Sequence, residues 1–340
     1  MRVVACTAAL AACNDDSAML DEIPSPPLDA SGVTHGNVET FAIDAIYLGD
    51  TDRLGGPPTA DAWRMYGFDL DHRATVSTST DTCTVPHSIR PQSDGAYGID
   101  NSFGFSLMSV ASDGSSFYPL FPTSDEINAI RDGSYTLQLQ FDGLPTNADD
   151  AVGISMQAFP SGRFAAGAPA FDTTTDWPVL TSAFVDGGTF DGGALFHRLD
   201  GYVTHGTFVS GAPQEEGLFV PVLVRVFFGL APVTVLVHHA TITFTRVGDA
   251  LRDGIIAGVL DPTEFGSALQ GLASGCKAFA NAEVTSMLDS LDDGTNAPGV
   301  PCTRISIGLG FTARKVANPT MVTTDAPPCS DAGITDSASE

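Results

Sequence analysis

Two stretches of the chain gather oxygen-bearing side chains at spacings that suit a hard cation. Asp69 and Asp71 stand two residues apart in GFDLDHRAT, so on a strand their side chains point to the same side. Asp94, Asp100 and Asn101 follow in the glycine-rich stretch SDGAYGIDNSFG, where backbone carbonyls add further oxygens. Calcium takes about six to eight oxygen ligands, so the set predicts a structural Ca²⁺ site. The alternative is that these side chains satisfy backbone N–H groups of local turns, because the spacing is not that of an EF-hand loop.

Aromatic side chains could supply a second kind of chemistry, the stacking of rings on sugars. The candidates are Trp63, Tyr66, Tyr97, Tyr118 and Trp177. If they are exposed, they predict glycan contact. The alternative is that they lie in the core or at its edge, where large aromatic residues more often lie.

Catalytic motifs that can be recognised from spacing alone do not occur. The sequence holds no HExxH, no GxSxG and no CxxC. A glycosidase needs two carboxylates at a defined separation, and among 41 Asp and Glu residues some pair always fits. We therefore assign no catalytic residue, and we keep a hydrolase acting on envelope polysaccharide or peptidoglycan through Asp or Glu as the alternative function.

The first residues read as a targeting segment that ends at a cysteine. Arg2 precedes an uncharged run of mostly small and apolar residues, which is too short to span a bilayer. The run ends in Leu10-Ala11-Ala12-Cys13, which resembles the lipobox of bacterial lipoproteins. The resemblance implies removal of residues 1–12 and acylation of Cys13, so that the chain is anchored to a membrane. An ordinary cleavable signal and a cytosolic chain are the alternatives.

The residues after Cys13 bear on where the anchor would lie. Asn14 favours the outer membrane, by analogy with the sorting rule of enteric lipoproteins. Residues 13–37 are acidic and proline-rich, which predicts a tether between the membrane and the folded domain.

The charge balance limits the kinds of partner that the protein is expected to bind. The chain has 15 basic and 41 acidic residues, a formal net charge of -26. A surface of that sign repels phosphate backbones, so nucleic-acid binding is not expected, whereas cations are attracted. Membrane contact is then expected through the acyl anchor, and a glycan or a surface protein is the expected partner.

Four cysteines remain once Cys6 is removed and Cys13 is acylated. An even number in an exported chain predicts two disulfides, with three possible connectivities. We favour Cys276–Cys302, which closes a short loop, and Cys83–Cys329, which would pin the C-terminal tail (residues 318–340).

Short apolar or alternating runs separated by Gly, Pro and Asp fill the chain from residue 38 to about 247. YTLQLQF (residues 135–141) alternates as a strand with one wet face, and FVPVLVRVFFG (residues 219–229) is apolar on both faces, as in a strand between two layers. Asp-Gly turn signals occur nine times. The pattern predicts a mainly β domain over residues 38–317, a β-sandwich or jelly roll.

Helical signals are few. A short helix is expected from Ser124. A late helical insertion is expected around residues 261–292, with Asp261 as N-cap, Pro262 at the first position and Glu264 as capping-box acid. The chain then returns to a strand, in which Ile305, Ile307, Leu309 and Phe311 share one face.

Three segments resemble a group of uncharacterised lipoproteins predicted in myxobacteria. They are the DLD of residues 69–71, GIDNSFG (residues 98–104) and CTRISIGLGFTA (residues 302–313). The resemblance implies a lipoprotein and no particular activity. The sequence thus predicts an exported lipoprotein with a binding or structural role at the cell envelope, through adhesion or glycan contact, and no cofactor other than a structural Ca²⁺.

Overall fold

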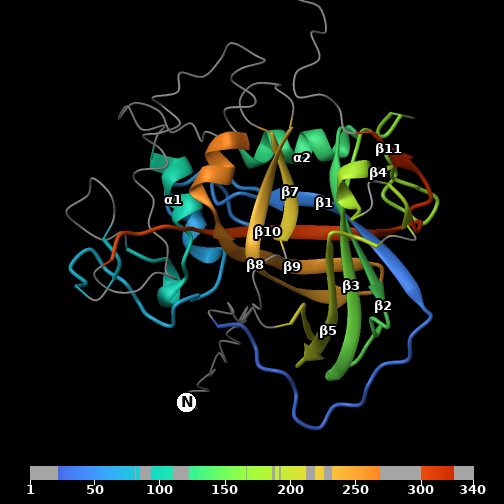
Figure 1. Ribbon diagram of the computed structural model, residues 1–340, viewed down its shortest axis with the longest axis horizontal. Helices are drawn as coiled ribbons and strands as arrows, with labels where there is room; N and C mark the ends of the chain where they lie inside the picture. The colour runs from blue at the N-terminus through green and yellow to red at the C-terminus, as the bar shows by residue number, and fades with distance from the viewer. Residues whose placement is uncertain are drawn as a thin grey trace, which may run out of the picture.

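Eight antiparallel strands close into a barrel in the computed structural model of the chain (Figure 1). The order around the ring is β3, β2, β1, β10, β9, β8, β6, β5, and β5 pairs again with β3. The structure describes residues 22–80, 82–84, 93–109, 122–165, 167–185, 188–190, 193–211, 219–225, 232–268 and 300–324. The strands of the ring are β1 (Val38–Tyr47), β2 (Thr136–Asp142), β3 (Ala151–Ser161), β5 (Phe196–Thr204), β6 (Thr207–Val209), β8 (Pro232–Val247), β9 (Ala250–Leu260) and β10 (Ile305–Val316).

Three more strands and several short helices lie outside the ring. β7 pairs with the first half of β8, and β4 joins β3 to β11. The strands are β4 (Val179–Leu180), β7 (Phe219–Arg225) and β11 (Val322–Thr323). The helices are η1 (Ala62–Met65), η2 (Ala96–Gly98), α1 (Ser102–Ser109), α2 (Thr123–Arg131) and η3 (Thr181–Ala183).

The prediction of a β-sandwich or jelly roll is wrong. A sandwich keeps two separate sheets, whereas here one sheet closes on itself when β3 pairs with β5, as in Ala151 opposite Val203. Short alternating strands are common to both architectures, so the sequence pattern does not distinguish them. The run at residues 219–229, which we predict to lie between two layers, is described up to Arg225. This strand, β7, pairs with β8, and its Val220 and Val222 belong to the main core.

Phenylalanine side chains fill the interior of the barrel. Phe141 meets Phe208 and Phe244 edge-on, with ring centroids 5.2 and 5.3 Å apart. Phe208 and Phe244 stack at 4.6 Å, and Phe41 and Phe311 pack around this group. A core packed in this way is rigid, because each ring is held by several others.

The strand expected at the end of the chain is confirmed. β10 runs between β1 and β9, and the inward side chains Ile305, Ile307, Leu309 and Phe311 all belong to the main core. β2 also forms as predicted, but its other face is not wet. Gln138 is fully buried there, and its side-chain amide donates to Ser161 Oγ and to the Trp177 carbonyl.

Charged side chains close one end of the barrel. Arg246 on β8 lies 2.7 Å from Glu39 on β1, and Lys315 on β10 lies 2.5 Å from the same carboxylate. Arg246 also donates to the Leu144 carbonyl and lies over the Phe41 ring. Although burial opposes ionisation, these two cations hold the pKa of Glu39 below its usual range.

Helices cover the other end. Ala129 and Ile130 of α2 belong to the main core, and Figure 1 shows α2 across the top of the barrel with the helix of residues 262–268 beside it. The short helix predicted from Ser124 is therefore confirmed. Of the predicted insertion at 261–292, residues 262–268 are helical and 269–292 lie outside the described residues.

Residues 22–37, the second half of the predicted tether, lie against the barrel. The Pro24 carbonyl accepts a hydrogen bond from the Tyr202 hydroxyl, and the Val33 N–H donates to Val152 on β3. The Gly36 N–H donates to Asp142 at the end of β2. Any free tether after Cys13 is therefore confined to the residues before Glu22.

Candidate functional site

Three of the five predicted calcium ligands meet in the structure. Ligand oxygens of Asp69, Asp71 and Asp100 all lie within 4.8 Å of one another. Asp100 lies two residues before α1, and the two other aspartates lie in the loop after η1. This loop is not a strand, so the reason we gave for the pairing of Asp69 and Asp71 is wrong. Turns, not strand alternation, bring the two carboxylates to one side.

Burial keeps this acidic cluster from ionising fully. Asp100 is only 4% exposed, and its Oδ2 accepts a hydrogen bond from the Leu70 N–H at 2.7 Å. Burial, with the neighbouring charges of Asp94, Asp71 and Asp69, raises the pKa of Asp100 to about 9. Burial and the charge of Asp69 also raise the pKa of Asp71 to about 6. The hydrogen bond that the Arg73 N–H donates to Asp71 acts in the opposite direction but is the smaller effect. A divalent cation would offset this repulsion, so the cluster has oxygens suited to Ca²⁺.

The two other predicted ligands, Asn101 and Asp94, accept hydrogen bonds from the backbone or donate them to it instead. Asn101 donates from Nδ2 to the carbonyls of Trp63, Tyr66 and Gly308, and its Oδ1 accepts from the N–H groups of Gly104 and Gly308. Its polar atoms are committed to the backbone, so its assignment as a metal ligand is wrong. The Asp94 carboxylate accepts a hydrogen bond from the Thr75 N–H.

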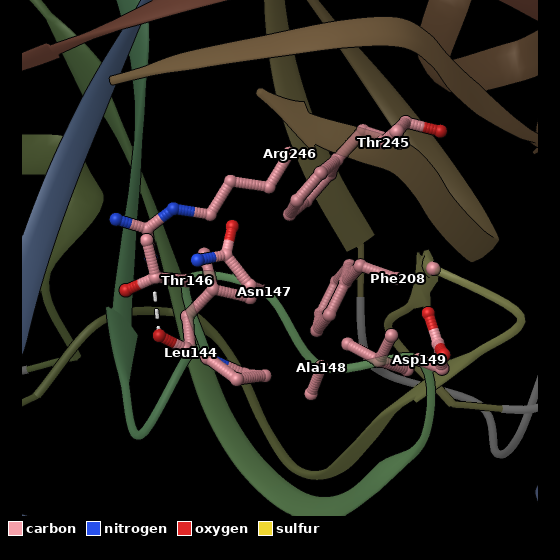
Figure 2. Close-up of a pocket in the computed structure, with 12 residues that line it drawn as sticks. Leu144, Thr146, Asn147, Ala148, Asp149, Phe208, Thr245 and Arg246 are labelled. Carbon is pink, nitrogen blue, oxygen red and sulfur yellow. Dashed lines mark hydrogen bonds between the residues drawn. The ribbon is translucent and has the colours of Figure 1, made fainter. Parts of the chain in front are cut away.

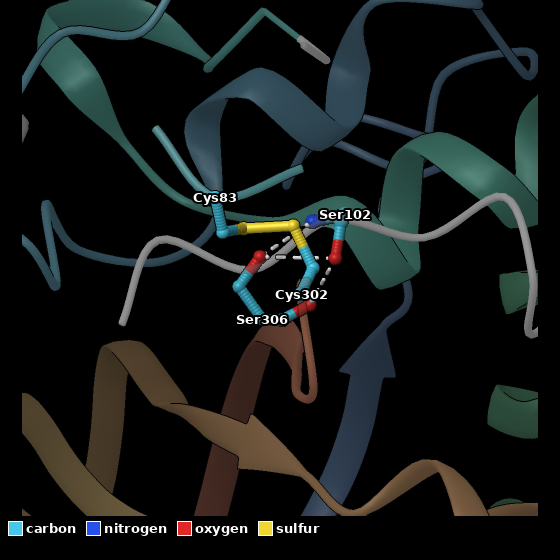
Figure 3. Close-up of a disulfide and its surroundings, with 4 residues drawn as sticks. All are labelled: Cys83, Ser102, Cys302 and Ser306. Carbon is cyan, nitrogen blue, oxygen red and sulfur yellow. Dashed lines mark hydrogen bonds between the residues drawn. A yellow bond between two sulfur atoms is a disulfide. The ribbon is translucent and has the colours of Figure 1, made fainter. Parts of the chain in front are cut away.

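Two of the segments singled out in the sequence, residues 98–104 and 302–313, meet at Asn101, and the third, residues 69–71, meets Asp100. Gly308 of β10 lies so close to the chain at Tyr66 that a Cβ there would come within 2.2 Å of the Tyr66 carbonyl oxygen. Ser102 and Ser306 hydrogen-bond to each other beside this contact (Figure 3). These contacts pack α1 and the loop before it against β10.

A disulfide between Cys83 and Cys302 lies next to this junction (Figure 3). It replaces both pairings that we favoured, Cys276–Cys302 and Cys83–Cys329. The backbone brings these two sulfurs together, because the Thr84 N–H donates to the Val300 carbonyl and the Cys302 N–H donates to the Thr84 carbonyl. Our prediction rested on the length of the loop that each pairing would close. A disulfide forms instead where the fold brings two cysteine Cα atoms close enough for the bond. Cys276 and Cys329 lie outside the described residues.

The predicted aromatic platform does not form. Trp63, Tyr66 and Trp177 are each at most 1% exposed, so none of them can stack on a sugar. Tyr97 is 70% exposed, and Tyr118 lies outside the described residues. A single exposed ring is a weak platform for a glycan.

One pocket opens at the barrel end that carries the buried ion cluster. This Arg246 pocket has a volume of about 280 Å³ (Figure 2). Phe208 and Phe244 line it, Arg246 and Asp149 supply its charges, and the loop after β2 (residues 144–149) completes the lining. Because Arg246 is already bonded to Glu39 and Leu144, it has little capacity left for a ligand.

A larger pocket lies toward the other end, between β8 and the helix of residues 262–268. This Glu264 pocket has a volume of about 360 Å³. Its apolar lining residues are Pro160, Leu195, Leu236, Leu260, Phe265 and Ala268. Its polar lining residues are Ser182, Thr234, Asp261 and Glu264. Its volume lies within the range of small-molecule sites.

Asp261 and Glu264 were noticed in the sequence only as helix-capping residues. Asp261 does cap the helix, since its Oδ1 accepts hydrogen bonds from the N–H groups of Thr263 and Glu264. The Glu264 side chain instead reaches β8, where its Oε2 lies 2.6 Å from His238 Nε2. No spacing rule predicts this contact, because the two residues belong to elements whose packing is set by the barrel.

No family model, curated protein or solved structure matches the chain. In the part of the chain that the structure describes, no helix is both long and apolar enough to cross a membrane. The function must therefore be argued from the site itself.

Proposed function

We propose that the chain is an exported lipoprotein, acylated on Cys13 and held at the outer membrane, with a binding role at the cell envelope. The Cys13 anchor rests on the lipobox resemblance of residues 10–13. The proposal separates into an anchor, a rigid carrier and a binding surface, and each has its own support.

The observation that carries export is the Cys83–Cys302 bond. Disulfides form and persist in oxidising compartments and are rare where thiols are kept reduced. This bond is mostly buried, with Cys83 only 4% exposed, and it joins the loop before α1 to the start of β10. A structural disulfide at such a place supports a chain that folds outside the cytoplasm.

The barrel supports a binding role over a hydrolytic one. A closed pocket holding two carboxylates with separated pKa values would favour a hydrolase. The described carboxylates whose pKa is raised, Asp50, Asp71 and Asp100, line neither the Arg246 pocket nor the Glu264 pocket. The pockets lie instead on a barrel whose packed interior makes it a rigid carrier.

The docked N-terminal segment fits an anchored protein. Because the chain contacts the barrel from Ile23 onward, only residues 14–21 lie between Cys13 and Glu22, which is nine positions further along the chain. Nine residues span at most roughly 30 Å when fully extended. An acyl chain on Cys13 would thus hold the barrel close to the membrane surface, within reach of envelope components.

The test is intact mass combined with membrane fractionation, for the native chain and for Cys13→Ser expressed in a Gram-negative host. We expect the native chain to lose residues 1–12, gain acyl mass on Cys13 and fractionate with the outer membrane. Cys13→Ser should lose the acyl mass and leave the membrane fraction. An unprocessed, soluble native chain would overturn the anchor and localisation.

A further inference from the structure

The Glu264 pocket combines apolar and acidic lining residues. Its apolar lining includes Leu236 of β8, Leu260 of β9, and Phe265 and Ala268 of the 262–268 helix. Phe265 is held in place by Phe103 of α1, with ring centroids 5.8 Å apart. The apolar lining is therefore built by residues that the core fixes, and it does not depend on flexible side chains.

Both charged side chains that line this pocket are acidic. Although partial burial opposes ionisation, the N–H groups of Glu264 and Thr263 and the charge of Arg304 hold the pKa of Asp261 below its usual range. Asp261 is already engaged with Arg304 at 3.1 Å. Glu264 is half exposed, with Oε2 held by His238.

Glu264 has a further acceptor to offer. Within the described residues, its Oε1 has no hydrogen-bond partner, while the His238 contact fixes the direction of the carboxylate. The exposed Thr234 adds a hydroxyl to the same lining. A group bound in the pocket would find an oriented carboxylate oxygen, a hydroxyl and apolar surface.

We propose that the Glu264 pocket binds a small amphipathic amine, with its apolar part against Leu236, Leu260 and Phe265 and its ammonium group on Glu264. Charge complementarity selects this class, because the described residues of the lining include two carboxylates and no cationic side chain. The net charge of -26 adds a long-range field that attracts cations and repels fatty-acid anions. This inference deepens the proposed binding role and does not depend on the acyl anchor.

The test uses the full-length chain with Cys13→Ser, purified without detergent, and the neutral fluorophore phenylnaphthylamine as reporter. Octylammonium, octanol and octanoate then compete for the pocket, so the apolar chain is kept and only the head group changes. We expect octylammonium to displace the reporter at about a fivefold lower concentration than octanol, and octanoate to be the weakest.

Variants assign the effect to this pocket. Glu264→Gln should remove the advantage of octylammonium over octanol and leave octanol unchanged. Asp149→Asn, a matched loss of one carboxylate in the Arg246 pocket, should leave the order of the three competitors as it is. Thr234→Trp and Ala268→Phe should each weaken the binding of the reporter by filling the pocket, and thermal melting shows that each variant is folded.

Two outcomes overturn the inference in different ways. If the three competitors act equally, or if Glu264→Gln keeps the preference, the head-group assignment is wrong, while a binding role at the pocket stands. If neither Thr234→Trp nor Ala268→Phe changes reporter binding, the pocket itself is wrong. Neither result bears on acylation at Cys13, which the mass measurement tests separately.

Discussion

Replacing Asp100 by asparagine should change how the stability of the protein depends on pH. The carboxyl group has a pKa of about 9 in the folded chain, against a usual value of 3.8. Because the folded state holds this proton more tightly than the unfolded state, the stabilisation is fully present below the unfolded-state pKa. It is lost as the pH rises toward the folded-state pKa.

The size of the effect follows from the width of that window. Each pH unit between the two pKa values costs up to about 1.4 kcal/mol, so raising the pH from 5 to 8 should lower the free energy of unfolding by about 4 kcal/mol. Asp71, with its pKa raised to about 6, contributes in the same direction. Asparagine can still accept the Leu70 N–H hydrogen bond but does not titrate, so Asp100→Asn should lose most of this dependence.

The assay is urea unfolding at pH 5 and pH 8 in the presence of a chelator. Asp149→Asn, which removes an exposed carboxylate, is the control and should behave as the native chain does. If the native chain and Asp100→Asn lose the same free energy between the two pH values, burial does not hold the proton and the reasoning is refuted.

A second arm of the same experiment tests the calcium prediction for Asp69, Asp71 and Asp100. At pH 8 a bound cation would displace the proton and offset the repulsion, so millimolar Ca²⁺ should raise the unfolding free energy of the native chain more than Mg²⁺ does. Asp100→Asn should gain little. No gain from Ca²⁺ in the native chain would show that the cluster is not a calcium site.

Three further predictions concern the framework of the fold. Arg246→Met should lower the free energy of unfolding by about 3–5 kcal/mol, because Glu39 would remain buried with one cation fewer; urea unfolding measures this, and a loss below about 1 kcal/mol would contradict it. Replacing Cys83 and Cys302 by serine together should cost about 5 kcal/mol in the entropic model, since the two residues are 219 positions apart. Thiol labelling checks the bond, which is refuted if Cys83 reacts in the unreduced, denatured native chain. Asn101→Ala should cost more than about 3 kcal/mol in urea unfolding, because it leaves several buried backbone groups without partners; a variant as stable as the native chain would show that these bonds matter little.

Local patterns predicted the strands but not how they close. The inward face of β10 could be read from alternation alone, since Ile305, Ile307, Leu309 and Phe311 are spaced by two and point the same way. Barrel closure depends on β3 pairing with β5. The alternation of apolar and polar residues along the sequence does not predict which strands pair. The wet face assigned to Gln138 failed for the same reason, because the segment around Trp177 covers it.

Asp-Gly pairs show a similar limit. Asp132-Gly133 and Asp142-Gly143 lie at the ends of α2 and β2, where the chain turns as predicted. Asp200-Gly201 and Asp253-Gly254 lie inside β5 and β9 instead. A Cβ at Gly201 would come within 2.8 Å of the Ile154 carbonyl oxygen, so close strand packing, not a turn, requires glycine there.

Asp100 and Asn101 separate what sequence reasoning can and cannot assign. Both are buried, both are polar, and the sequence predicts both as metal ligands because oxygen atoms on a glycine-rich loop suit calcium. The side-chain amide of Asn101 donates to and accepts from backbone groups around Gly308. These hydrogen bonds hold the loop against β10, and they are sufficient reason for an asparagine there. Asp100 accepts one backbone hydrogen bond and faces two other carboxylates, which adds repulsion that the junction does not need. Asp100 thus adds electrostatic repulsion that the packing of the loop does not require, whereas Asn101 has a purely structural role. Of the two residues, Asp100 is therefore the one at which to look for function.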